Sequence, residues 1–278
     1  MLDGLSGTLR PFGQPFLEIT VIPGNSDTRD GVLFCLPFVA AFIIFLVFPI
    51  VFGFFISFFR WDILSSRQWI GFNNYIRMFS DKTFYTSLWH TIFFVLVSTP
   101  LLLVIGFLMA LFVTSRSVLN GTAENIFFLP YILSITVIAT LWAWLFQRSY
   151  GLFNGIIVYF GGNPVNWLTS SDTAMWSIVI ATLWWTAGFN MVLFSAGIKQ
   201  ISADIYEAAR IDGASYGQTI FKITIPLIRP TTVLCLILQI IASFNIFGQV
   251  YVMTGGGPYG STRVLVQYIY ETGFKYFK

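Results

Sequence analysis

The sequence predicts an all-α protein that crosses a membrane several times. Its 278 residues are 56% hydrophobic and only 10% charged, whereas ordinary soluble domains are about 25% charged. Five stretches without Asp, Glu, Lys or Arg are long enough to cross a bilayer as helices, and they cover residues 31–59, 91–113, 126–146, 175–198 and 231–254. Because lipid offers no hydrogen bonds to the backbone, stretches of this kind are expected to be helical.

Residues 1–30 differ from the rest in composition and form a polar N-terminal tail. The tail has no apolar segment after a basic start, so it does not fit a secretory signal peptide. Residues 31–278 are expected to form a single transmembrane domain. Lys and Arg residues occur in the connecting loops on both sides of the expected membrane, so the positive-inside rule does not decide the orientation.

The sequence lacks the residues that several kinds of chemistry require. The sequence has no GxxxxGK[ST] phosphate-binding loop, so we expect no ATP hydrolysis by this chain and no catalytic residues. His90 is the only histidine, and Cys35 and Cys235 lie in apolar stretches. These cysteines are interpreted as buried small hydrophobes, and no metal site is expected. A net charge of +3 spread thinly along the chain gives no case for nucleic acid.

Residues 201–226 are the charged exception between two uncharged stretches. A charged side chain at the centre of a bilayer costs about 2.5 to 3.5 kcal/mol on insertion scales, so this segment is expected to lie in water. Ser202 or Asp204 is placed to cap a helix, and Gly213 is placed to end it in the left-handed conformation. Within this helix Ile205, Ala208, Ala209 and Asp212 share one face. Two alanines make that face shallow, so another protein could approach closely, although an ordinary amphipathic connector fits equally well.

The same segment resembles a known motif. Glu207, Ala208 and Ala209 are followed after three residues by Gly213 and after nine more by Ile223 and Pro226, with Ile225 in place of a leucine. This pattern is similar to the EAA loop of binding-protein-dependent, type I ABC importer permeases. The resemblance is to the carbohydrate branch, which includes the maltose and glycerol-phosphate type permeases. That family has at least six spans in its core, so a sixth span is expected past the end of this sequence.

The resemblance implies roles and partners. The segment 201–226 would be cytoplasmic and would couple the chain to an ATPase through Glu207, Ala208, Ala209, Arg210, Asp212 and Gly213. No cofactor is expected in this chain, because ATP and Mg²⁺ would bind the partner ATPase. The partners implied are a second, related permease, two ATPase subunits and a periplasmic solute-binding protein. The location implied is the lipid bilayer of the bacterial cytoplasmic (inner) membrane.

A substrate pathway is expected along the fourth and fifth spans. Its candidate residues are polar or aromatic, together with one isoleucine: Trp185, Phe189, Asn190, Gln239, Ser243, Asn245 and Ile246. Amides and aromatic rings suit a sugar, which presents hydroxyl groups on its edge and C–H groups on its faces. The resemblance to disaccharide transporters singles out five of these positions, although Gln239 and Ser243 are different residue types from those of that subfamily. Amides inside a membrane also serve as hydrogen bonds between helices, and that interpretation stays open.

The tail contains the sequence TGGGP, which resembles a signature before the last helix of the family. Gly255, Gly256, Gly257 and Pro258 are therefore candidates for a gate or for docking of the binding protein, since glycines permit close backbone approach. A plain turn before a helix is an equally good interpretation. The favoured function is a permease subunit of an ATP-driven carbohydrate importer. The alternatives are an ion-coupled secondary carrier, which the charge-free spans disfavour, and a non-transporting assembly protein.

Overall fold

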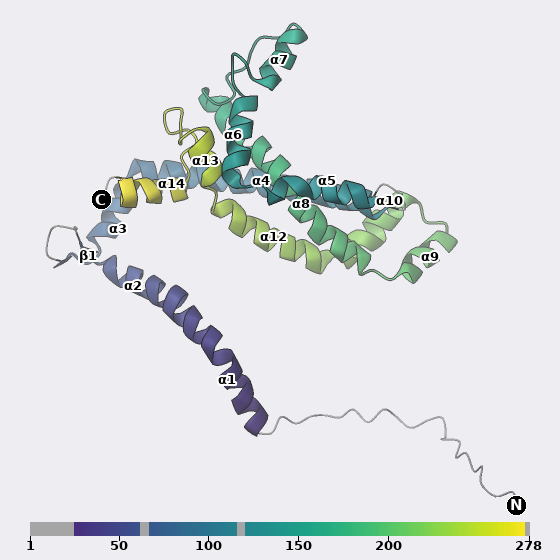
Figure 1. The fold of residues 1–278 in the computed structure, drawn as a ribbon, viewed down its shortest axis with the longest axis horizontal. Helices are drawn as coiled ribbons and strands as arrows, with labels where there is room; N and C mark the ends of the chain where they lie inside the picture. The colour runs from purple at the N-terminus through teal and green to yellow at the C-terminus, as the bar shows by residue number, and fades with distance from the viewer. Residues whose placement is uncertain (1–24, 62–66, 116–119, 276–278) are drawn as a thin grey trace, which may run out of the picture. The chain divides into compact units, whose positions relative to one another are not determined.

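The computed structural model describes residues 25–61, 67–115 and 120–275. The chain divides into two compact units, Met1–Asn74 and Tyr75–Lys278. Most of the polar tail predicted for residues 1–30 lies outside the described residues. Figure 1 shows that both units are built mainly from helices.

The first unit consists of one long apolar helical stretch and a small hairpin. Helix α1 (Asn25–Phe42) continues through the π-helical turn η1 (Ile43–Val47) into α2 (Phe48–Ile56). Residues 29–56 of this stretch are long and apolar enough to cross a membrane. The hairpin pairs β1 (Phe59–Arg60) with β2 (Gln68–Trp69) in antiparallel register. Asn74 fixes it, because its Nδ2 donates to the carbonyl oxygens of Ser57 and Phe59 at 2.8 and 3.1 Å.

The second unit is organised around two long helices, α4 (Lys82–Thr114) and α8 (Ser171–Lys199). Asp81 caps α4 by accepting a hydrogen bond from Thr83 N, and Ser170 caps α8 in the same way. Small residues bring helices close together: a Cβ on Gly106 of α4 would lie 2.6 Å from Asn190 Cβ of α8. This arrangement is typical of helix packing in membranes, where close backbone approach replaces a hydrophobic driving force.

Two of the five expected spans are divided into two helices each. The stretch 126–146 was expected as one helix, but it divides into α5 (Asn120–Ile132) and α6 (Ile135–Leu145), which meet at 95°. Ser134 caps the new helix by accepting from Val137 N. The stretch 231–254 divides into α12 (Arg229–Phe244) and α13 (Gly248–Met253), and the helical segment Tyr216–Leu227 meets α12 at 68°. Within the described residues, three helices are long enough to span, or five spans result if each bent pair is one span.

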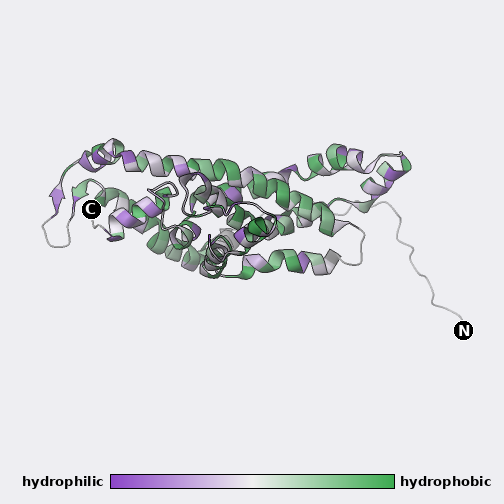
Figure 2. Ribbon diagram, turned by 90° about the horizontal axis from the view of Figure 1, so that it is seen from above, coloured by the Kyte–Doolittle hydropathy of each residue, from purple (hydrophilic) through white to green (hydrophobic). Residues whose placement is uncertain are grey.

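The remaining elements are short. They are α3 (Asn73–Ser80), α7 (Leu152–Tyr159), α9 (Ala203–Ile211), α10 (Tyr216–Thr219), η2 (Ile220–Thr224), α11 (Ile225–Leu227), α14 (Leu265–Tyr270) and η3 (Glu271–Lys275). Thus a further helix already begins at Leu265, inside the tail after which a sixth span was expected. In Figure 2 the long helices are coloured mainly as hydrophobic, and hydrophilic residues gather toward their ends and connections.

Candidate functional site

Helix α9 has the start and the stop that the sequence predicts. Ser202 is its N-cap and accepts a hydrogen bond from Asp204 N at 3.3 Å. At the other end Gly213 has φ +74°. Ala214 N donates to Ala209 O at 2.9 Å and Gly213 N donates to Arg210 O at 3.1 Å, which together form a Schellman motif. Figure 1 shows α9 and α10 at one end of the second unit, away from α6, α7 and α13.

The open face of α9 differs in part from the prediction. Ala209 is buried. Tyr206, about one helical turn before it, places its hydroxyl 3.2 Å from Thr224 Oγ1. Ala209 therefore packs inward. Ala208 points about 100° away from it around the helix and faces outward, so the two alanines do not form one open face. The exposed surface carries Glu207, Ala208, Arg210 and Asp212. It also carries Ile211, which is 86% exposed and which the sequence analysis missed.

Helix α9 joins two helices of the second unit. Its N-terminus follows the end of α8 directly, and its C-terminus leads through the capping box of Ser215 and Gln218 into Tyr216–Leu227 and then α12. The end of α8 is also held to α5, since Lys199 Nζ lies 3.1 Å from Glu124 Oε2. A displacement of α9 would therefore act on α8 and α12 first.

The predicted pathway amides bond to one another across helices. Asn190 Nδ2 of α8 donates to Gln239 Oε1 of α12 at 3.0 Å, and Gln239 Nε2 donates to Ser243 Oγ at 3.1 Å. Ser243 Oγ also lies within hydrogen-bond distance of Ser98 and Thr99 on α4. All of these side chains are buried. The network thus joins three helices, as expected for interhelical hydrogen bonds.

The other pathway candidates divide into two groups. Trp185 and Phe189 are half-buried, and both lie beside Tyr131 at the end of α5. The rings of Tyr131 and Phe189 stack with centroids 4.9 Å apart, and Trp185 is 6.4 Å from Tyr131. The sequence analysis missed Tyr131, because its neighbours come from a different helix. Ile246 packs into the apolar core, and exposed Asn245 donates to Ile241 O of its own helix.

The TGGGP segment is a firmly held turn. Gly255 and Gly256 have φ +59° and +86°, and Gln267 Nε2 of α14 donates to Gly255 O at 2.8 Å. A Cβ on Gly256 would lie 2.6 Å from that same Nε2. The second bond of Gln267 goes to Glu271 Oε1 at 3.0 Å, and Arg263 forms an ion pair with this carboxylate.

This turn lies beside the loop that follows α6. A hollow of about 260 Å³ is shared by the two, with a lining of Phe146, Gln147, Arg148, Trp167, Leu168, Thr169, Met253 and Thr254. The end of α13, which leads into the turn, and the loop after α6 therefore meet in space.

Comparison with known proteins gives consistent matches. The family described as binding-protein-dependent transport system inner membrane component matches residues 82–277. A trehalose/maltose transport system permease protein of Thermococcus litoralis is 37% identical over 238 residues, which are 85% of this chain and 80% of that protein. An arabinooligosaccharides transport system permease protein of Bacillus subtilis is 32% identical, over 88% of this chain and 78% of its own.

A solved structure has the same fold. One chain of the crystal structure of a bacterial alginate ABC transporter, in complex with an alginate pentasaccharide-bound periplasmic protein, superposes with a TM-score of 0.77. It is 24% identical and covers 91% of this chain and 86% of its own length. Together with the family match, this likeness confirms the predicted all-α membrane fold of an importer permease.

Proposed function

The chain belongs to the family of binding-protein-dependent transport system inner membrane components, and from this premise we propose that it imports a carbohydrate. It is a multi-pass transport subunit, and in this proposal separate ATPase subunits supply the energy and bind ATP and Mg²⁺. The observation that carries the proposal is α9, an exposed and capped helix with the EAA-type sequence, inserted between α8 and α12.

Carbohydrate is the proposed cargo for two reasons. Relatives at 37% and 32% identity are named for trehalose/maltose and arabinooligosaccharide transport. In addition, Trp185, Phe189 and Tyr131 present partly exposed aromatic rings next to buried amides. Aromatic faces stack on the C–H faces of sugars, and amides bond to their hydroxyl groups.

Coupling would run through the exposed face of α9. Glu207 offers an acidic contact, Ala208 allows close approach, and Ile211 offers an apolar contact to a groove on the ATPase. Because its caps hold α9 as a unit, closure of the ATPase dimer would move it as a rigid body. The movement would pass into α8 and α12, which α9 joins, and from there into the amide network between them.

The proposed orientation rests on the resemblance of the α9 sequence to the EAA loop, and the opposite end of the second unit is placed accordingly. The α9 end faces the cytoplasm and the ATPases. The TGGGP turn and the loop after α6 face the periplasm of a bacterium and receive the solute-binding protein, as expected for a subunit of the inner membrane. A second permease subunit, related to this one but different in sequence, would complete the pathway.

A crosslinking experiment tests the proposal. Cys235 is buried as expected, but Cys35 is exposed in the first unit, contrary to the expectation from the sequence. The chain, with Cys35→Ser to remove this exposed thiol, is reconstituted with its ATPase, partner permease and binding protein. A thiol at Ala208→Cys is expected to capture the ATPase, whereas a thiol at Tyr259→Cys, fully exposed in the region of the TGGGP turn, is expected not to. Failure of Ala208→Cys to capture the ATPase would contradict the coupling role. Uptake that continues without ATP would instead support an ion-coupled carrier.

A further inference from the structure

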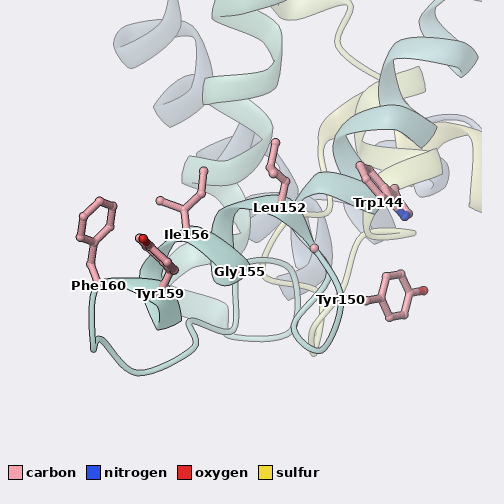
Figure 3. Close-up of a pocket in the computed structure, with 8 residues that line it drawn as sticks. Trp144, Tyr150, Leu152, Gly155, Ile156, Tyr159 and Phe160 are labelled. Carbon is pink, nitrogen blue, oxygen red and sulfur yellow. The ribbon is translucent and has the colours of Figure 1, made fainter.

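Helix α7 and the end of α6 border an open hollow that none of the roles above uses. Its volume is about 420 Å³, and it is lined by Trp144, Tyr150, Gly151, Leu152, Gly155, Ile156, Tyr159 and Phe160. Figure 3 shows Ile156, Tyr159 and Phe160 gathered at one end of the hollow and Trp144 with Tyr150 at the other. The lining contains no charged side chain.

The inner side of α7 is rigidly attached. Asn154 is buried, and its Nδ2 donates to Val165 O at 2.9 Å and to Arg148 O at 3.2 Å. Its Oδ1 accepts from Val165 N at 2.9 Å and from Trp167 Nε1 at 3.1 Å. Phe153 beside it packs against the ring of Trp142. These contacts fix which face of α7 points outward.

The outward face of α7 is apolar. Leu152, Ile156 and Tyr159 recur at intervals of four and three residues, which places them on one side of the helix. They are 52%, 47% and 85% exposed, and Phe160 after them is 81% exposed. Gly155 lies between them, and a Cβ there would meet no atom within 4 Å. A small side chain can therefore be introduced at this position without a clash at Cβ.

Two observations indicate what covers this face. First, residues 149–171 carry no charged side chain, although surfaces that face water are normally charged. Second, the face continues a stripe on α6, a helix of a candidate bent span. Val137, Leu141 and Trp144 on that stripe are 54%, 41% and 51% exposed. The apolar surface thus runs from a candidate membrane-spanning segment onto α7, and Trp and Tyr are the residues that favour membrane–water interfaces.

We propose that α7 lies in the membrane–water interface of the leaflet opposite the α9 end, and that its hollow holds lipid hydrocarbon. Amphipathic interfacial helices bury their apolar face about 5–10 Å into the boundary between headgroups and acyl chains, and α7, whose inner face is held to the protein by Asn154 instead of being charged, would present its apolar face in the same way. Anchored through Asn154, α7 would fix the depth of the loop after α6 and, through the hollow beside Thr254, the depth of the TGGGP turn. The inference is independent of the cargo and of ATP coupling.

Fluorescence quenching tests this placement. The thiol variants Gly155→Cys, Ile156→Cys and Tyr159→Cys, each with Cys35→Ser, are labelled with an environment-sensitive dye and reconstituted in phosphatidylcholine vesicles. The quenchers are phospholipid nitroxides near the headgroup and iodide in water. The matched control is Tyr259→Cys, whose side chain is fully exposed. At the three α7 positions we expect several-fold stronger quenching by lipid and several-fold weaker quenching by iodide than at the control.

Three results would overturn the proposal. Iodide quenching as strong at Ile156→Cys and Tyr159→Cys as at Tyr259→Cys would place α7 in water. Strong iodide quenching at Gly155→Cys alone would show that the hollow holds water rather than hydrocarbon. Protection from iodide that arises only after the partner permease or the binding protein is added would assign the face to that protein instead. Loss of uptake in any variant does not bear on these outcomes, because the quenching is measured on the folded, inserted chain.

Discussion

Replacing Gly213 by alanine isolates the backbone requirement at the end of helix α9. A Cβ at this position would meet no atom within 4 Å, so the substitution creates no clash. Its cost comes from the φ of +74°, because a left-handed conformation costs an L-residue other than glycine roughly 1–2 kcal/mol. That cost corresponds to about a 5- to 30-fold increase in the opening equilibrium of the helix end.

Hydrogen exchange measures this effect directly. In lipid nanodiscs, the amides of Gly213 and Ala214, which close the Schellman motif, are expected to exchange about 5- to 30-fold faster in Gly213→Ala. The matched control is Gly217→Ala in α10, which also has open space around it and has no positive φ. Alanine is favoured over glycine inside a helix by about 0.5–1 kcal/mol, so this control should not accelerate exchange. Equal exchange in the two variants would refute the reasoning.

The functional consequence is tested with a bulkier residue. Gly213→Leu is expected to insert into the membrane normally while ATP turnover stimulated by the binding protein is lost, because α9 no longer ends in the shape that its docking requires. Normal stimulated turnover in this variant would remove the docking argument even if the exchange result held.

Three further predictions concern charge, packing and the amide network. Glu207→Lys should abolish stimulated ATP turnover without loss of insertion, and turnover at the normal level would contradict its docking role. Gly188→Ala would place a Cβ 2.2 Å from Phe127 O on α5. It should lower the free energy of unfolding by about 1–3 kcal/mol and lower the melting temperature. Gly121→Ala, where nothing lies within 4 Å of the added Cβ, should not. A double-mutant cycle between Asn190→Ala and Gln239→Ala should give a coupling of about 0.6–2 kcal/mol in thermal unfolding, and zero coupling would refute the bond between them.

Local signals predicted the ends of α9 correctly. Ser202 and Gly213 act within one turn of chain, so their roles can be read from the sequence before any packing is known. The five apolar stretches were located for the same reason, since composition alone marks a segment that can enter lipid. The side of α9 that packs inward was less accessible, because it depends on Tyr206 reaching Thr224 across eighteen positions of sequence.

The division of two expected spans into shorter helices was not predicted. An apolar run gives no period that distinguishes one long helix from two helices at 95°, and Ser134 caps α6 with a side chain that is also common inside membrane helices. The place of Tyr131 beside the predicted pathway was not predicted either, because its stacking partner Phe189 is on another helix, α8. Contacts of this kind depend on the tertiary packing of bent helices.

The amide network places a condition on the pathway. In this structure Asn190 Nδ2 donates to Gln239 Oε1, so neither amide offers its full hydrogen-bonding capacity to a sugar. The indole N–H of Trp185, in contrast, is buried without a partner among the described residues. A sugar that replaces Asn190 as the partner of Gln239 Oε1 must break this bond, and a separation of α8 from α12 would break it. These are the two helices that α9 connects, so a movement applied at α9 would open the amide pair. In the proposed transporter the ATPase would therefore control access to the amides, and the aromatic rings of Tyr131, Trp185 and Phe189 would meet the cargo first.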